Sequence, residues 1–298
     1  MGEAAALISA LCWAGTSVAL ARLGTRYGSA VLSGLRFLIA SPFVIALLFV
    51  TGNAGQLRHA EASAVLAMVA SAAIGYGIGD TLYIRSLPRV GLQRMSPSAT
   101  ALWVAMSAAG AVLILGEPAG WDLAVGGTSV VAGVYLVVSG QVQALPEPGG
   151  PARLGAIPTL AVLVGVASAW AAATLILAGG RGSLGAIAAG AVRIPAGGAV
   201  IALVATVATR GTVLRRLPSP RDFPLLLAIG IGGTAVGSLL YIYAVATAGA
   251  ARAVILNSTS PLMVVPLSMI FLGERPTMRV GVGTLFCLAG TLIVVRGG

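Results

Sequence analysis

The sequence that decides the fold is GYGIGDTLYI at residues 75–84, because a close copy of it, GTAVGSLLYI, stands at residues 233–242. The two stretches share glycines at their first and fifth positions and the final Leu-Tyr-Ile. Glycines four residues apart on a helix let a neighbouring helix approach closely. We therefore interpret both stretches as parts of packed helices, and the pair as a sign of internal duplication.

The duplication extends outward over the whole chain. The matched positions carry residue types that are scarce in this sequence, namely Trp13 and Trp170, Arg36 and Arg193, and Glu117 and Glu274. Matches of alanine or valine arise by chance in so apolar a chain, whereas matches of Trp, Arg and Glu do not. The sequence therefore predicts two related repeats, at residues 1–141 and 155–298, joined by a Pro- and Gly-rich linker at residues 142–154.

The composition is that of an integral membrane protein. Of the 298 residues, 58% are apolar and only 9% are charged, whereas soluble domains average about 25% charged residues. So few charges cannot cover the surface of a soluble enzyme, and that class is excluded. The formal net charge is +10, but the arginines lie singly between apolar runs instead of on one face. We therefore expect no nucleic-acid partner.

Apolar runs bounded by charge, Gly or Pro give ten candidate helices, and a bilayer-spanning helix needs roughly 20 apolar residues. The runs are residues 4–22, 28–51, 62–84, 91–114, 119–140, 155–178, 184–208, 223–246, 250–272 and 278–296. Because five helices per half is an odd number, the second half must enter the bilayer from the opposite side. The sequence thus predicts an all-α integral membrane protein with ten transmembrane helices in two inverted five-helix repeats. Many secondary transporters are built in this way.

Several short motifs resemble those of the drug/metabolite transporter superfamily, in its EamA-like ten-helix branch. They are Trp13-Ala14-Gly15, the run LRFLIA at residues 35–40, Leu82-Tyr83, Leu115-Gly116-Glu117 and Leu272-Gly273-Glu274-Arg275. The resemblance covers nearly the whole chain, and its most specific part is the Leu-Gly-Glu motif at matched places in both halves. It implies transport of a small organic metabolite and leaves the substrate open among amino acids, nucleotide sugars, sugar phosphates and drugs.

Arg36 and Asp80 are the most informative ionisable residues. Ionisable groups inside a membrane span are costly, so they usually face a partner or a cavity. The second and third helices run antiparallel, which brings these two residues to the same side of the membrane and makes an ion pair feasible. We expect the pair either to lock the two helices together or to open during transport as a gate, and not to carry a proton.

Arg193 stands at the position matched to Arg36, but the position matched to Asp80 is Ser238. Without a carboxylate there, Arg193 must extend to the membrane surface, cap backbone carbonyls, or bind an anionic ligand. Glu117 and Glu274 follow glycines at helix ends, where a solvated capping role is the simplest interpretation.

Polar residues inside the fourth and ninth predicted helices indicate a substrate site. Proline frees a backbone carbonyl, which is tolerated at membrane depth only where protein or cavity water satisfies it. Interrupted helices of this kind are the best sequence indication of a transporter site. We therefore expect substrate contacts from the polar residues beside Pro97 and Pro261 and from nearby aromatic residues, namely Trp13, Ser96, Ser98, Trp170, Tyr241, Asn257 and Ser258.

Other functional classes find little support in the sequence. The only histidine, His59, lies in a polar loop, so a hydrolase lacks a base within the membrane, and a zinc-protease motif is absent. A P-loop would need a lysine, and every basic residue is arginine. We therefore expect a non-enzyme without cofactor or metal. The function predicted is alternating-access transport, as an exporter or an exchanger, of a metabolite such as an amino acid. A channel, a membrane scaffold or a membrane enzyme is the alternative.

The expected setting is the inner or plasma membrane, with several spans, as a monomer or a homodimer. The arginines that flank the helices favour both termini outside by the positive-inside rule. The family resemblance implies both termini in the cytoplasm, and we favour that orientation.

Overall fold

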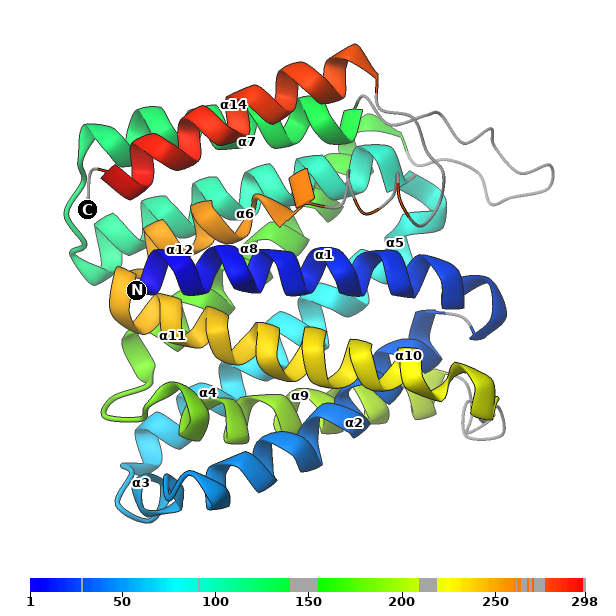
Figure 1. Cartoon of the computed structure of the whole chain (residues 1–298), viewed down its shortest axis with the longest axis vertical. Coiled ribbons are helices and arrows are strands. Elements are labelled where there is room, and N and C mark those ends of the chain that lie inside the picture. The colour runs from blue at the N-terminus through cyan, green and yellow to red at the C-terminus, as the bar shows by residue number, and fades with distance from the viewer. Residues whose placement is uncertain are drawn as a thin grey trace.

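The computed structural model describes residues 1–27, 29–90, 92–139, 155–208, 219–260, 262–263, 267, 270 and 277–296. Within these ranges every regular element is helical, without a strand. The long helices lie side by side, and α1 begins at the same end of the bundle at which α14 ends (Figure 1). The predicted linker at residues 142–154 lies outside the described residues.

The first half contains eight helical elements, of which three form one continuous third helix. The elements are α1 (Gly2–Tyr27), α2 (Ser29–Val50), α3 (Ala54–Arg58), α4 (Ala62–Ala72), η1 (Ala73–Asp80), α5 (Thr81–Val90), α6 (Leu92–Leu115) and α7 (Trp121–Ser139). The continuous third helix of this half is α4–η1–α5.

The second half repeats the order. Its described elements are α8 (Ala156–Gly180), α9 (Ala186–Ala208), η3 (Pro220–Asp222), α10 (Phe223–Leu227), η4 (Ala228–Gly237), α11 (Ser238–Ala248), α12 (Ala250–Asn257) and α14 (Met278–Arg296). Its third helix is η3–α10–η4–α11, continuous in the same way.

Nine of the predicted helices coincide with observed ones, and some ends differ where polar residues continue a helix beyond its apolar run. The third helix, for example, extends from the predicted end at residue 84 to Val90. Of the ninth, predicted at residues 250–272, the structure describes a helix over Ala250–Asn257, and much of the remainder lies outside the described residues. Six helices in the described part are long and apolar enough to cross a membrane, and two shorter apolar helices, Ala99–Leu115 and Trp121–Leu136, accompany them. Ten spans are therefore not confirmed, although a multi-pass membrane protein is.

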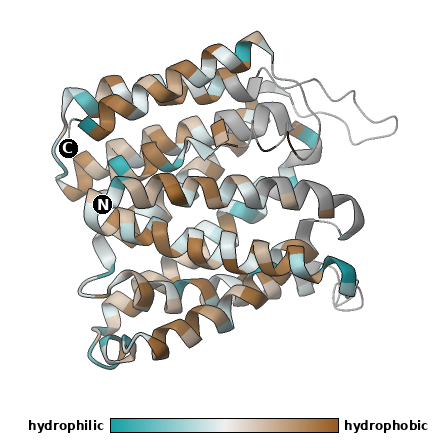
Figure 2. Ribbon diagram, viewed as in Figure 1, coloured by the Kyte–Doolittle hydropathy of each residue, from teal (hydrophilic) through white to brown (hydrophobic). Residues whose placement is uncertain are grey.

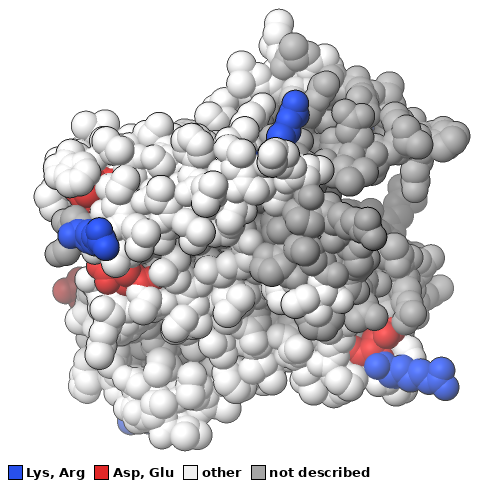
Figure 3. Space-filling model, turned by 45° about the horizontal axis from the view of Figure 1, so that its top comes forward, with Lys and Arg blue, Asp and Glu red and all other residues white. Residues whose placement is uncertain are grey.

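The outer surface fits a lipid environment. Hydrophobic residues predominate along the coloured parts of the helices (Figure 2). Large apolar residues such as Leu38, Phe49 and Leu113 are 69%, 64% and 82% exposed. On the face seen in Figure 3, charged side chains are few among the described residues, whose surface is mostly uncharged. Such a surface is stable in hydrocarbon and costly in water.

The equivalent helices α7 and α14 cross each other in opposite directions. A Cβ atom on Gly126 would lie 2.8 Å from the Gly290 carbonyl oxygen, and one on Gly133 would lie 2.6 Å from that of Gly283. Positions that rise along α7 therefore meet positions that fall along α14, so the two helices are antiparallel. Gly126 and Gly133 are themselves the matches of Gly283 and Gly290. The crossing thus relates the two halves by an approximate two-fold axis perpendicular to the helices.

The halves also exchange their first helices. Gly233 on η4 packs against Thr16 on α1, and the equivalent Gly75 on η1 packs against Ala173 on α8. Each first helix therefore lies on the third helix of the other half. The predicted close approach at these glycines is confirmed, and the interface between the halves forms the centre of the molecule.

Both third helices widen into a π-helix at equivalent places, η1 and η4. The widened turns follow from the glycine-rich sequence, which leaves space for the bulge, and π-helical turns occur frequently at functional sites. Asp80 is the last residue of η1, and Ser238, its match, directly follows η4. The two bulges therefore set the positions of these two polar residues.

Glu117 joins the halves at one end of the bundle. Its two carboxylate oxygens accept hydrogen bonds from the backbone N–H groups of Ala250 and Ala251, at 2.6 and 3.0 Å. These are among the first N–H groups of α12, which have no partner within the helix. The predicted capping role is therefore confirmed, but the carboxylate is partly buried and caps a helix of the other half instead of facing solvent. Glu274, its match, lies outside the described residues.

Glu117→Gln is expected to lower the free energy of unfolding by about 1–2 kcal/mol. The amide loses both the negative charge at the positive end of the helix dipole and one of the two acceptor oxygens. The midpoint of thermal unfolding in detergent measures the change, with Glu61→Gln as a control, since Glu61 is exposed. Equal midpoints for the two variants would contradict the capping role.

Candidate functional site

Arg36 on α2 and Asp80 at the end of η1 form an ion pair inside the bundle. The Arg36 Nη2 atom lies 3.1 Å from the Asp80 Oδ2 atom, and the two side chains are 9% and 21% exposed. The pair lies within the first half, as the antiparallel arrangement of its second and third helices requires. Among the described residues, the buried Nε–H of Arg36 has no hydrogen-bond acceptor.

The two tryptophans that match across the halves contact this ion pair. Trp170, on the first helix of the second half, donates a hydrogen bond from Nε1 to Asp80 Oδ1 at 2.9 Å. Trp13 holds its ring 5.8 Å from the Arg36 guanidinium carbon, a cation–π distance. The sequence predicts substrate contacts from both rings. In the structure each ring contacts the ion pair, and the bond from Trp170 to Asp80 joins the two halves there.

Arg193 on α9 is buried, and only 5% of its surface is exposed. Its Nε donates to Ser71 Oγ at 3.0 Å and its Nη1 to Tyr76 Oη at 2.7 Å. The guanidinium carbon also lies 4.6 Å from the centre of the Tyr76 ring. Extension to the membrane surface was therefore the wrong alternative, because the third helix of the other half surrounds this side chain with hydroxyl groups.

Aromatic side chains from both halves lie beside the ion pair. The ring centres of Trp103 and Trp170 are 6.2 Å apart, and those of Trp103 and Tyr241 are 6.5 Å apart. Tyr83 lies 5.3 Å from Trp170. The Tyr241 hydroxyl is within 3.2 Å of Thr174 Oγ1, either atom being the donor. The structure thus brings Trp170 and Tyr241 into one cluster, with Trp103 between them.

Asn257, the last residue of α12, is 7% exposed. Its Nδ2 donates to Ser9 Oγ at 2.9 Å, and Ser9 Oγ donates to the Gly237 carbonyl oxygen at 2.7 Å. This chain connects three helices next to the bulge of η4. Ser258 behaves differently, since its hydroxyl donates to the Ile255 carbonyl of its own helix at 2.7 Å. The described hydrogen bond of Ser258 therefore stays within its own helix.

Ser96 and Ser98 lie in α6, and their side chains lie outside the described part of the structure. Their expected contacts with substrate thus stay a prediction. Among the described residues, His, Cys, Asp and Glu side chains form no group of three or more that could hold a metal ion.

Sequence reasoning missed Ser71 and Tyr76 as partners of Arg193, Thr174 as the partner of Tyr241, and Ser9 as the partner of Asn257. All four contacts join residues far apart in the chain, and Ser9, Ser71 and Thr174 are unremarkable polar residues in apolar runs. Tyr76 could have been singled out from the sequence, because it lies inside the glycine-rich stretch at residues 75–84 that is copied at residues 233–242.

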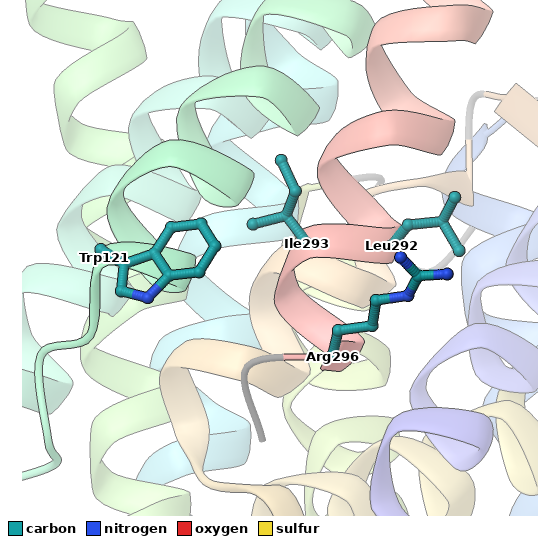
Figure 4. A pocket seen from close by; sticks show the side chains of 4 residues that line it. All are labelled: Trp121, Leu292, Ile293 and Arg296. Atoms are coloured by element: carbon teal, nitrogen blue, oxygen red, sulfur yellow. The ribbon is translucent and has the colours of Figure 1, made fainter.

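A shallow pocket of about 210 Å³ lies on the outer surface between the start of α7 and the end of α14. It is lined by Trp121, Leu292, Ile293 and Arg296 (Figure 4). Trp121 and Leu292 are 72% and 56% exposed, so this surface faces lipid or the membrane interface. None of these residues is among the buried polar and aromatic residues described above, and we assign the pocket no role in transport.

Two interlocked helical repeats with charged and aromatic side chains buried between them define a membrane transporter. The family model of the EamA-like transporter family matches residues 1–139 and 157–296. The chain therefore belongs to the EamA-like transporter family. Its membership of a transporter family also supports the expectation that it is not an enzyme.

A solved structure entitled only "Crystal structure of protein" has a similar fold, with a TM-score of 0.79 and 16% sequence identity. The match covers 99% of this chain and 96% of that one. At this identity the similarity shows the fold alone. No curated protein matches the sequence.

Proposed function

We propose that the protein is a secondary carrier of a small organic metabolite, such as an amino acid, that works as an exporter or an exchanger. Ten membrane-spanning helices form two inverted repeats, at residues 1–141 and 155–298, which move against each other to open the site to either side in turn. The carrier resides in the inner or plasma membrane as a monomer or a homodimer.

The observation that carries this proposal is the position of the buried polar residues between the halves. Asp80 of the first half receives a hydrogen bond from Trp170 of the second, and Arg193 of the second donates to Ser71 and Tyr76 of the first. A rearrangement between the halves must therefore break or exchange these bonds. Binding energy from a substrate can drive such an exchange, because ligands shift an equilibrium by their differential affinity for its states.

We assign the substrate site to the buried polar and aromatic residues between the halves, which we call the central cluster. Its polar groups come from Arg36, Asp80, Arg193, Asn257 and Tyr241, and its apolar surface from Trp13 and Trp170. Ser96 and Ser98 would add hydroxyl groups from α6. Ser258 is left out of this site, because its hydroxyl group bonds to its own helix.

Counterflow in proteoliposomes tests the function. Vesicles loaded with an unlabelled solute are diluted into the same solute carrying a radiolabel, over a panel of amino acids, organic acids, amines and sugars. A carrier takes up label above the equilibrium level for a time, and only when the vesicles are loaded. A channel takes up label at a rate that does not depend on loading. Either that behaviour, or no protein-dependent uptake of any solute, would contradict the proposal.

Asn257→Ala is expected to lower counterflow at least about tenfold while leaving the folded yield unchanged. The change removes the amide from the cluster and releases Ser9, and an interaction lost from a site commonly costs at least this factor. Thr128→Ala serves as the control, because its hydroxyl lies on the exposed side of α7 and bonds to its own helix. Wild-type flux in Asn257→Ala would remove this residue from the site.

A further inference from the structure

The central cluster contains more positive than negative charge. Its charged side chains are the cations Arg36 and Arg193 and the anion Asp80, and Asp80 is paired with Arg36. Among the residues that the structure describes, no carboxylate lies within ion-pair distance of Arg193. With Asp80 ionised the cluster carries one excess positive charge, and with Asp80 protonated it carries two. A buried charge without a counter-ion is costly in a membrane protein.

The two guanidinium groups offer more N–H donors than their bonds to the described residues use. Two arginines offer ten N–H donors, and the bonds to described residues use three of them, one from Arg36 and two from Arg193. The buried Arg36 Nε–H finds no acceptor within the described ranges. The hydroxyl groups that bond to Arg193 are neutral acceptors, and Asp80, with which Arg193 also interacts electrostatically, is paired with Arg36. One carboxylate therefore balances the charge of two guanidinium groups. The cluster therefore has the capacity to bind an anion.

The approximate two-fold axis shows where the missing negative charge belongs. In the first half, Asp80 stands beside Arg36, and Gly79 next to it packs on Trp170. The equivalent residues of the second half are Ser238, Arg193, Gly237 and Trp13. A Cβ on Gly237 would lie 3.8 Å from Trp13 Nε1, so the equivalent Gly–Trp packing is present. Only the carboxylate is absent, because Ser238 replaces it.

Ser238 has properties expected of a residue that meets a ligand. It is 2% exposed, and its buried hydroxyl oxygen has no hydrogen-bond partner in the part of the chain that the structure describes. It begins α11, which packs against α9, the helix of Arg193. Buried polar atoms without a partner are rare in folded proteins. A bound ligand would supply the partner that this hydroxyl group lacks.

We propose that the substrate is a small organic anion whose carboxylate binds Arg193 and Ser238, at the place that the two-fold axis relates to the Asp80 carboxylate. This proposal rests on the proposed transport function and names its substrate class. The aromatic cluster of Trp103, Trp170 and Tyr241 favours an anion with an apolar or aromatic body. The substrate completes in the second half the charge balance that Asp80 supplies in the first.

Three probes with the same phenylethyl body test the charge of the substrate. They are 3-phenylpropionate, an anion; phenylalanine, a zwitterion; and 2-phenylethylamine, a cation. Each is titrated into the purified full-length protein, and the midpoint of thermal unfolding is measured, with sodium chloride at the same concentration as the control. We expect 3-phenylpropionate to raise the midpoint most. Equal or stronger stabilisation by phenylalanine, 2-phenylethylamine or chloride, or none by 3-phenylpropionate, would overturn the proposal.

Variants locate the binding of the anion. Arg193→Gln is expected to weaken 3-phenylpropionate binding at least about tenfold, because the charged partner is lost. Ser238→Asp places a carboxylate beside Arg193 and is expected to abolish anion binding without lowering the midpoint below that of Ser238→Asn, which has the same size and no charge. Unchanged affinity in Arg193→Gln, measured on protein that elutes as a single folded species, would remove Arg193 from the site.

Counterflow of the same probes separates this proposal from the function on which it rests. Exchange of 2-phenylethylamine or phenylalanine in preference to 3-phenylpropionate would leave a carrier and refute the anionic substrate. Binding of 3-phenylpropionate that depends on Arg193, without exchange of any probe or panel solute, would leave the anion site and refute the carrier.

Discussion

Asp80→Asn is expected to lower the free energy of unfolding in detergent by about 3–5 kcal/mol, because it leaves the buried Arg36 guanidinium without its counter-ion. Arg36 is 8% exposed, so water cannot replace the carboxylate. Trp170 also loses a charged acceptor for its Nε1–H. The double change Asp80→Asn with Arg36→Gln is expected to recover part of the loss, because it removes both charges together.

Chemical denaturation followed by tryptophan fluorescence measures the three proteins. A double variant no more stable than Asp80→Asn alone would show that the pair does not act as a unit. A second readout is the pH dependence of counterflow. If Asp80→Asn folds well, keeps its flux and loses only its pH dependence, Asp80 carries a proton and the locking or gating role is wrong.

Gly290→Val is expected to have the second large effect, a loss of about 3 kcal/mol, at the upper end of the usual cost of overpacking. A Cβ at this position would lie 2.5 Å from the Gly126 carbonyl oxygen and 2.8 Å from the Val130 nitrogen. Both atoms belong to the α7 backbone, which cannot rotate away as a side chain does. The helices must separate, so the thermal midpoint is expected to fall by about 6 °C or more.

Gly281→Val is the matched control on the same helix. A Cβ there meets no atom within 4 Å, so only the small difference in helix propensity is expected to appear. If the two variants unfold at the same temperature, the close crossing of α7 and α14 is not what holds the halves together.

The sequence predicted much of the fold because the signals are repeated and local. Each apolar run reports its own helix, and scarce residues such as Trp13 and Trp170 align the two halves. The contact between Arg36 and Asp80 followed from helix direction alone, since both residues belong to neighbouring helices. The end of the third helix at Val90 did not follow, because Arg85 and Arg89 continue the helix with side chains that hydropathy excludes from a span.

The site was harder to predict because its contacts join the halves. The partners of Arg193 are Ser71 and Tyr76, and no local pattern connects them across so much sequence. The π-helical turns η1 and η4 shift the register of the residues that follow, which helical spacing cannot anticipate. Glu117 was expected to face solvent because the helix that it caps belongs to the other half, which its local sequence does not indicate.

Alternating access is the central claim, and two distances measured in one protein test it most directly. Ser63 and Thr247 lie at the end of the bundle where α1 begins, and Arg89 and Arg221 lie at the opposite end (Figure 1). All four are exposed. Each pair has one residue on the third helix of each half, and the internal repeat relates one pair to the other. Spin labels on cysteines at each pair, with Cys12 and Cys287 replaced by alanine, report both distances by double electron–electron resonance. With the solute that gives counterflow, the account predicts that one distance lengthens while the other shortens. Two distances that change together, or that both stay constant while counterflow proceeds, would contradict it.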